Sequence, residues 1–309
     1  GTAALIDASL LRPVESGDGE PRLMMLETVR EYGRNGLKAS GEEEAIRAHH
    51  AAYYLGLAEA AEANLRGARQ REWLDRLDGE LDILRAALDH TREADPDLGL
   101  GLAGGLARFW QVRGHVIEGR ELLSCLFAAR QRQEPMVVPG APYLKALLAA
   151  GQLAHLKHDS QSAIDYLSAA DILAEHLNDA PSRVRALCQL GYPQHESGDE
   201  AAAAHSWQTG LTLSKRLDDA WSRAFALRAW AFQQNMLGRD EAALEALEES
   251  LRLFRRWGDV WMTAHALWRL GYTRMWRRGD HRTAAALIVL EIAVTCAIVS
   301  AASPGFSKG

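Results

Sequence analysis

Cysteine is scarce in this sequence, and the residues present are far apart. Cys125, Cys188 and Cys296 form no CxxC or CxxH pair, so the usual metal-binding and redox spacings are absent. Disulfide-stapled secreted domains are rich in cysteine, and this chain is not. We therefore expect idle thiols in a reducing compartment, and a cytoplasmic location.

Catalytic signatures are missing as well. The sequence contains no GxxxxGK[ST] run, which would cradle phosphates and hold magnesium. It offers no evident Ser-His-Asp or Cys-His set, and the adjacent His49 and His50 diverge by about 100° on a helix, which prevents them from sharing an ion. We expect no enzyme activity, no cofactor and no metal in this chain.

A surplus of basic residues is also absent. The chain has 35 Lys and Arg against 41 Asp and Glu, a net charge of −6, which gives no general attraction to nucleic acid. It begins GTAALIDASLL, without the basic and apolar regions of a signal peptide. It also begins without Met, from which we expect a fragment or a trimmed sequence.

What the chain does contain is an internal repeat. The stretch 181–258 matches itself at an offset of 40 residues. The matched pairs include Leu187 with Leu227, Gly191 with Ala231, Gly198 with Gly238, Ala203 with Ala243, and Trp207 with Leu247. A fixed period of this size is typical of a repeat architecture.

Each copy reads as two amphipathic helices separated by a short turn, at His158-Asp159, Gly198-Asp199, Gly238-Arg239 and Gly279-Asp280. A small residue lies midway along each first helix, and another lies early in each second helix. These are Gly151, Gly191, Ala231 and Gly271, then Ala163, Ala203, Ala243 and Ala284. Small residues allow close helix approach, while Leu167, Trp207 and Leu247 fill the adjacent space. Single pairs cannot bury their apolar stripes alone, so the copies must stack.

These residues resemble the tetratricopeptide repeat in a longer form of about 40 residues, over roughly 141–290. The Ala203, Trp207, Gly210 series fits the second helix of that repeat well, while the first-helix pattern is only partly kept. The resemblance implies an all-α fold, an α-solenoid of antiparallel helix pairs that binds other molecules on its concave face.

The N-terminal 40 residues have a different character. Two short β-leaning runs, 10–14 and 22–26, flank the turn cluster ESGDGE, which predicts a β-hairpin. A helix over 27–37 follows and should stop at Ala39-Ser40-Gly41. Together with the end of a helix at 3–9, this could be a small αβ module or the last part of a winged helix.

A second resemblance rests on the runs LIDASLL (5–11) and PRLMMLETVREY (21–32), on EWLDRLDGELDILRAAL (72–88), and on FWQVRGHVIEGR (109–120). They look like a junction in bacterial signal-transduction ATPases related to NB-ARC proteins. There, a nucleotide-binding domain precedes a winged helix, a helical arm and tetratricopeptide-type repeats. The resemblance implies that an ATPase domain lies upstream of Gly1 and acts as a partner within the same full-length protein.

This gives four segments. Residues 1–40 are the winged-helix-like end, 41–134 a helical arm, 141–302 the repeats, and 303–309 a disordered tail. Within the arm, the spacing of apolar residues predicts helices over 42–66, 70–91, 98–112 and 116–133. Pro135 and Pro139 prevent a continuous helix and mark the boundary between the arm and the repeats. Trp110, in the run RFWQVR, is expected to pack between repeats or to line a groove.

The inward positions of the resembled family, carried onto this sequence, give three rows. They are Gln152, Tyr192, Phe232 and Tyr272; Leu148, Cys188, Arg228 and Trp268; and His155, His195 and Asn235. Aromatic and hydrogen-bonding side chains with an arginine suit a peptide or small-effector groove. The alternative is that half of these residues form inter-repeat core. His155 and His195 are one repeat apart, too far for a shared zinc ion.

The last predicted helix, 284–302, is almost wholly apolar. It could be a repeat helix covered by a further repeat, a marginal membrane anchor with Glu291 inside it, or an aberrant end. Two functions follow. The chain is either the sensor part of an ATP-dependent bacterial transcriptional regulator, or a free-standing tetratricopeptide adaptor, with membrane tethering through this helix as an open option. An in-frame P-loop upstream of Gly1 would favour the first.

Overall fold

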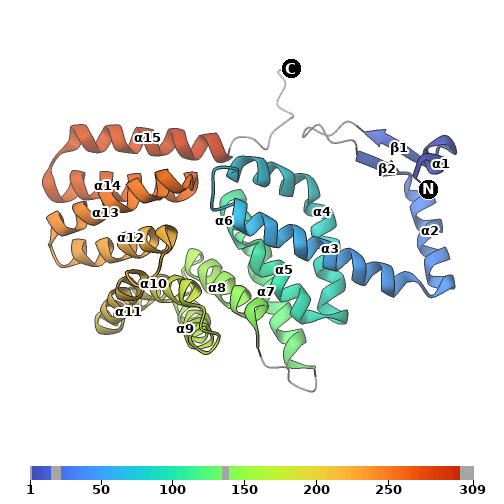
Figure 1. The fold of residues 1–309 in the computed structure, drawn as a ribbon, viewed down its shortest axis with the longest axis horizontal. Helices are drawn as coiled ribbons and strands as arrows, with labels where there is room; N and C mark the ends of the chain where they lie inside the picture. Colours follow the sequence, from blue (N-terminus) through green and yellow to red (C-terminus); the bar gives the residue numbers. More distant parts are fainter. Residues whose placement is uncertain (1, 15–21, 134–138, 300–309) are drawn as a thin grey trace.

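The computed structural model describes residues 2–14, 22–133 and 139–299. It begins with α1 (Thr2–Asp7), strands β1 (Leu11–Val14) and β2 (Arg22–Met25), and α2 (Glu27–Ser40). The strands pair antiparallel, with Leu11 opposite Met25, which confirms the predicted hairpin. Helix α2 ends at Gly41, whose left-handed backbone (φ 75°) suits a residue without a Cβ. This part projects from the rest of the molecule (Figure 1).

The arm consists of α3 (Glu43–Asn64), α4 (Gln70–Ala94), α5 (Pro96–Gly105), α6 (Ala107–Arg113) and α7 (Val116–Gln131). The single helix predicted over 98–112 is wrong, because the chain breaks at Leu106 between α5 and α6. Glycines make α5 a weak helix, but they allow close packing. A Cβ at Gly104 would lie 2.8 Å from the Cβ of Lys145 in α8.

Four helix pairs follow, and they confirm the predicted all-α solenoid (Figure 1). The pairs are α8 (Ala141–Leu156) with α9 (Ser160–His176), α10 (Ala180–Glu196) with α11 (Glu200–Ser214), α12 (Ala220–Met236) with α13 (Asp240–Trp257), and α14 (Val260–Arg278) with α15 (His281–Val299). The predicted turns lie between paired helices, and their glycines adopt positive φ, such as 83° at Gly198.

Aspartates recur at most of the helix starts. Each side chain accepts a hydrogen bond from a backbone N–H two or three residues ahead, at 3.0–3.2 Å, and so satisfies a free donor of the first turn. These residues are Asp159, Asp179, Asp199, Asp219, Asp259 and Asp280. Arg239 interrupts the series, and α13 has no side-chain cap there. These aspartates, spaced about 20 residues apart, therefore mark where successive helices begin.

The small residues act as predicted at the centre of the pairs. A Cβ added at Gly191 would lie 2.3 Å from the indole nitrogen of Trp207, and one at Gly151 would lie 2.5 Å from Cγ of Leu167. Trp207 is 1% exposed and donates its indole N–H to the Cys188 carbonyl at 3.2 Å. In these two repeats only glycine leaves room where the large side chain of the second helix crosses the first.

One hydrophobic core runs through the arm and into the repeats. It extends from Tyr54 in α3 to Leu190 in α10, and includes Trp110, which is 1% exposed, and Ile298 of α15. A second cluster spans α10 to α14 and includes Trp207 and Phe254. The arm and the first repeats are therefore packed against each other across the loop at 133–141, of which residues 134–138 lie outside the described part.

The solenoid curves until its ends meet, which the repeat pattern did not predict. The corner between α3 and α4 touches the corner between α13 and α14, where a Cβ at Gly258 would lie 3.0 Å from the Cβ of Ala68. The backbone N–H of Trp261 donates to Oε1 of Gln70 at 2.9 Å. In Figure 1 the repeats accordingly curve round from α8 until α14 and α15 lie beside α4 and α6.

Helix α15 pairs with α14 through Gly271 and the fully buried Ala284, as expected for a last repeat. Its other face exposes Val289, Leu290 and Ile292. Over the described ranges, the membrane-anchor alternative has no support, since none of their helices combines the length and apolarity needed to cross a bilayer. The rest of that predicted segment, 300–302, and the predicted tail, 303–309, lie outside the described residues.

Candidate ligand pocket

A cavity of about 320 Å³ lies where the arm faces the repeats. Helices α8, α10, α12 and α14 form one side, and α3 with its following turn, α5 and α6 form the other. Its wall consists of Glu62, Arg66, Gly104, Gly105, Ala107, Arg108, Gln111, Gln152, His155, Leu156, Arg185, Gln189, Tyr192, Glu196, Trp221, Phe225, Arg228, Phe232, Trp261, Met262, His265, Trp268 and Arg269. Ligand pockets commonly measure about 300–1,000 Å³.

Six of the nine residues predicted for the concave face meet in this wall. They are Gln152, His155, Tyr192, Arg228, Phe232 and Trp268. They come from four successive first helices, as expected for residues related by the repeat.

The other three predicted residues lie outside the wall. His195 packs edge-on against the ring of Phe232, with centroids 5.4 Å apart. Asn235 is only 4% exposed and donates to Oγ1 of Thr273 at 2.8 Å. Tyr272 is 39% exposed beside Trp268.

The second predicted row divides between core and pocket. Leu148 and Cys188 are 1% and 0% exposed and belong to the hydrophobic core, whereas Arg228 and Trp268 line the cavity. Each repeat is rotated slightly against its neighbour in a solenoid. Positions that are equivalent in sequence therefore change their surroundings along the stack.

Sequence reasoning missed a row that lines the cavity in the last three repeats. Arg185, Phe225 and His265 are 40 residues apart, one helical turn before the row of Cys188, Arg228 and Trp268. The period could have revealed this row, but only knowledge of the superhelical twist selects it over its neighbour.

The arm's contribution was also missed. Glu62, Arg66, Arg108 and Gln111 line the cavity from α3, the turn after it, and α6. Arg108 and Gln111 belong to the run RFWQVR, in which Trp110 is core. Gln111 accepts a hydrogen bond from Gln152 at 2.6 Å, which joins the arm to the first repeat.

Aromatic rings form the central part of the wall. The rings of Tyr192 and Phe232 have centroids 5.3 Å apart, and His155 stacks on Tyr192 at 5.9 Å. The guanidinium of Arg228 lies 5.7 Å from the Tyr192 centroid, and that of Arg269 lies 4.2 Å from the Phe232 centroid. Cations over ring faces within about 6 Å are attracted to them.

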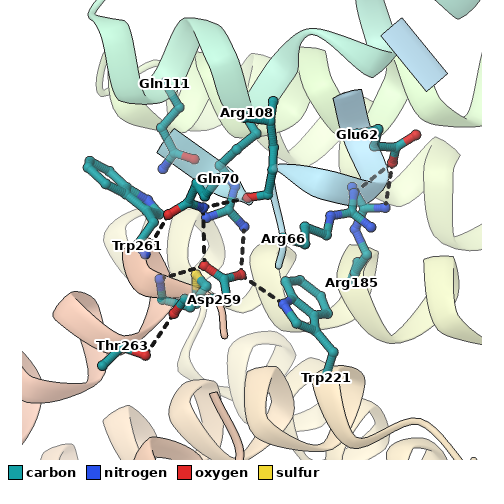
Figure 2. Close-up of polar contacts among 12 residues, drawn as sticks. Glu62, Arg66, Gln70, Arg108, Gln111, Arg185, Trp221, Asp259, Trp261 and Thr263 are labelled. Atoms are coloured by element: carbon teal, nitrogen blue, oxygen red, sulfur yellow. Dashed lines mark hydrogen bonds and ion pairs between the residues drawn. The ribbon is translucent and has the colours of Figure 1, made fainter. Parts of the chain in front are cut away.

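Glu62 neutralises one end of the pocket. Its carboxylate lies 2.7 Å from Arg66, 3.1 Å from Lys145 and 3.5 Å from Arg185, part of which Figure 2 shows. Burial alone would raise the pKa of Glu62, but the charges of Arg66, Arg185 and Lys145 together lower it. Glu62 therefore stays ionised and its charge is fully engaged.

Asp259 is a second carboxylate beside the pocket, and it joins distant parts of the chain (Figure 2). The carboxylate is fully buried. It accepts hydrogen bonds from Nε1 of Trp221 at 2.9 Å, from Nε2 of Gln70 at 3.4 Å and from the backbone of Met262 at 3.0 Å. Arg108 lies 3.8 Å from it. One side chain therefore caps α14, contacts the arm and holds Trp221 in place.

The surroundings of His265 show which sign of charge dominates inside the cavity. Burial, together with the charges of Arg228, Arg108 and Arg269, lowers the pKa of its imidazole to about 3. The ring, which packs against Trp261, is therefore neutral at pH 7. Positive charge dominates this part of the cavity.

The part of the chain that the structure describes contains no group of three or more His, Cys, Asp or Glu side chains placed to hold a metal ion. The wall instead offers what a binding pocket for an organic ligand requires, namely aromatic faces, hydrogen-bonding groups and fixed charge.

No protein-family model matches this sequence. A segment of 197 residues, 61% of the chain, is 32% identical to a protein of Mycobacterium bovis named as a candidate HTH-type transcriptional regulator, and equally so to its Mycobacterium tuberculosis counterparts. The segment covers 22% of each relative's length, so the match spans about a fifth of those proteins.

Among solved structures, the chain is similar to a Rap protein complexed with competence and sporulation factor (TM-score 0.58, 11% identity, 82% of this chain and 78% of that chain). It is also similar to BtubC from P. vanneervenii (TM-score 0.50, 13% identity, 76% of this chain and 96% of that chain). At such identities the likeness concerns the fold, which is a tetratricopeptide-like helical repeat scaffold.

Proposed function

We propose that this chain is the ligand-capturing sensor region of a bacterial transcriptional regulator. The observation that carries the proposal is the cavity between arm and repeats, with its aromatic wall and half-buried arginines. The name of the mycobacterial relatives supports the regulatory setting. The Rap protein, a scaffold of similar fold, was solved in complex with competence and sporulation factor. Our proposal is that this chain likewise acts by capture rather than by catalysis.

We further propose that the sensor belongs to an ATP-dependent regulator in the cytoplasm, in which residues 1–40 are the end of a winged-helix domain. The arm would span 41–134 and the repeats 141–302. The runs LETVREY and RLDGELDILRAAL support this assignment, as does the greater length of the mycobacterial relatives. The encoding gene tests it: an in-frame P-loop upstream of Gly1 supports the ATPase, and a start codon there with no such motif contradicts it.

The mechanism follows from which elements hold the pocket. Arg108 and Gln111 belong to the arm, while Tyr192 and Arg228 belong to the repeats. A ligand that touches both sets binds the closed arrangement more tightly than an open one and shifts the population toward it. The shift is limited by that difference in affinity, and it would be transmitted through the arm to the preceding domains.

A thermal-shift screen of metabolites and short peptides tests capture in the pocket. Compounds that raise the melting temperature are measured again with Tyr192→Ala, Phe232→Ala and Arg228→Ala. We expect each substitution to weaken binding, because each removes part of the wall. Tyr53→Ala is the matched control, since Tyr53 is 61% exposed on α3 and does not line the cavity. Hits that bind all four variants as well as the native chain would contradict the proposal.

A further inference from the structure

The charges of the pocket wall are unbalanced. Five arginines line it, and two of the carboxylates nearby, Glu62 and Asp259, engage three of them, Arg66, Arg108 and Arg185. The third carboxylate, Glu196, contacts His155 at 3.4 Å and accepts a hydrogen bond from Ser160. Among the residues that the structure describes, Arg228 and Arg269 have no carboxylate within ion-pair distance.

Arg228 and Arg269 lie on the same aromatic surface. Arg228 covers the ring of Tyr192, Arg269 covers that of Phe232, and the two rings are in contact. The guanidinium carbon of Arg269 also lies over the ring of Trp268, 5.3 Å from its centroid. Two cations and three rings therefore form one continuous patch of the wall.

This arrangement is costly without a further group. Burial lowers the pKa of the Arg269 guanidinium, and Arg228 adds to this effect while Tyr192 opposes it; the guanidinium keeps its proton. Nε of Arg228 is buried without a hydrogen bond, as are Oε1 of Gln189 and Nε1 of Trp261. Buried charges and polar groups are normally paired, so the wall is short of an anion and of hydrogen-bond partners.

We propose that Arg228 and Arg269 together bind the carboxylate of a small ligand whose planar, apolar part stacks on Trp268 and the neighbouring rings. This inference rests on the proposed capture function and names its ligand class. Guanidinium groups bind carboxylates through paired, charge-assisted hydrogen bonds. The cavity volume of about 320 Å³ suits a small molecule or the last residue of a peptide.

Matched acids and amides test the charge directly. Aromatic carboxylates, among them naphthalene-2-carboxylate, are titrated against the full chain by calorimetry, each beside its carboxamide. A short peptide ending in tryptophan is measured as the free acid and as the amide, which distinguishes a metabolite from a peptide terminus. For the aromatic carboxylates, the peptide, or both, we expect the acid to bind at least about tenfold more tightly than its amide.

Variants locate the effect. With Arg228→Gln or Arg269→Gln the acid and its amide should bind with equal affinity. With Arg228→Lys the preference for the acid should fall but persist, because lysine keeps the positive charge and lacks the paired donors of the guanidinium. Arg252→Gln, on the exposed face of α13, should leave the preference unchanged. Thermal melts of each variant show that it is folded.

Bound acid should also raise the pKa of His265, because an anion offsets the charge of the nearby arginines. This pKa can be followed by NMR.

The inference is overturned if acids and amides bind the native chain equally, if the preference survives both glutamine variants, or if no carboxylate of the panel binds at millimolar concentration. The proposed function has a separate test. Neutral hits that depend on Tyr192 and Phe232 would preserve capture in the pocket while rejecting the carboxylate.

Discussion

Gln70 and Asp259 are 189 positions apart in the chain, yet their side chains meet in a fully buried contact at 3.4 Å. Gln70 starts α4 and Asp259 caps α14, so this contact joins the arm to the last repeat. It encloses a cavity that would otherwise be an open concave face. The enclosure partly shields the arginines of the wall from solvent, which strengthens electrostatic interactions there.

Asp259→Ala should destabilise the chain far more than an ordinary loss of a helix cap. It removes the cap of α14, the acceptor for Trp221 and the carboxylate beside Arg108. Breaking a buried ion pair costs about 3–5 kcal/mol. Asp199→Ala is the matched control, because Asp199 caps α11 in the same way but is exposed, and it should cost about 1 kcal/mol. Urea unfolding of both variants measures the difference; equal losses would contradict the closure.

Gly191→Ala should lower the free energy of unfolding by about 1–3 kcal/mol, the usual effect of overpacking a core. The added Cβ would lie 2.3 Å from the indole nitrogen of Trp207. Gly56→Ala, in the exposed face of α3 with no atom within 4 Å, should instead stabilise by about 0.5–1 kcal/mol, since alanine is the better helix former. Opposite signs in paired denaturant titrations are the predicted result. A neutral or stabilising Gly191→Ala would show that the helices pack less tightly there.

Stability should fall as the pH drops from 7.5 to 5.5, and His265 should account for part of the fall. Burial, together with the charges of the nearby arginines, lowers the pKa of His265 to about 3, against about 6.5 in the unfolded chain. Between these values the unfolded state binds more protons, so acid favours unfolding. The contribution is about 1.4 kcal/mol at pH 5.5. His265→Gln should therefore show a smaller loss between these pH values, measured by urea unfolding; an unchanged loss would mean that His265 titrates normally.

Repeat chemistry made much of this fold predictable. Gly191 and Trp207, the turn at Gly198 and the aspartates near the helix starts all act within one repeat or between neighbours, so a fixed offset in sequence reveals them. The hairpin was predictable for the same reason, because a turn cluster and two short apolar runs are local signals. The break at Leu106 was missed because glycine-rich α5 also fits a continuous apolar pattern.

The pocket was only partly predictable. Tyr192 and Phe232 follow from the repeat, since their helices are adjacent and equivalent. The enclosure depends on the summed rotation of four repeats, which no single unit specifies. The contact between Gln70 and Asp259 therefore has no counterpart in the periodic pattern of the sequence. The arm has no 40-residue period at all, and Arg108 could not be assigned to the same cavity as Arg228.

The central claim is that the scaffold closes on itself around this cavity, and a distance measurement tests it most directly. Spin labels at Arg71→Cys in α4 and Arg256→Cys in α13, both exposed, flank the contact of Ala68 with Gly258, with exposed Cys125 and Cys296 replaced by serine. We predict one narrow distribution at the short end of the range of pulsed electron paramagnetic resonance, broadened by Asp259→Ala. A broad or long distribution in the otherwise native chain would contradict the account.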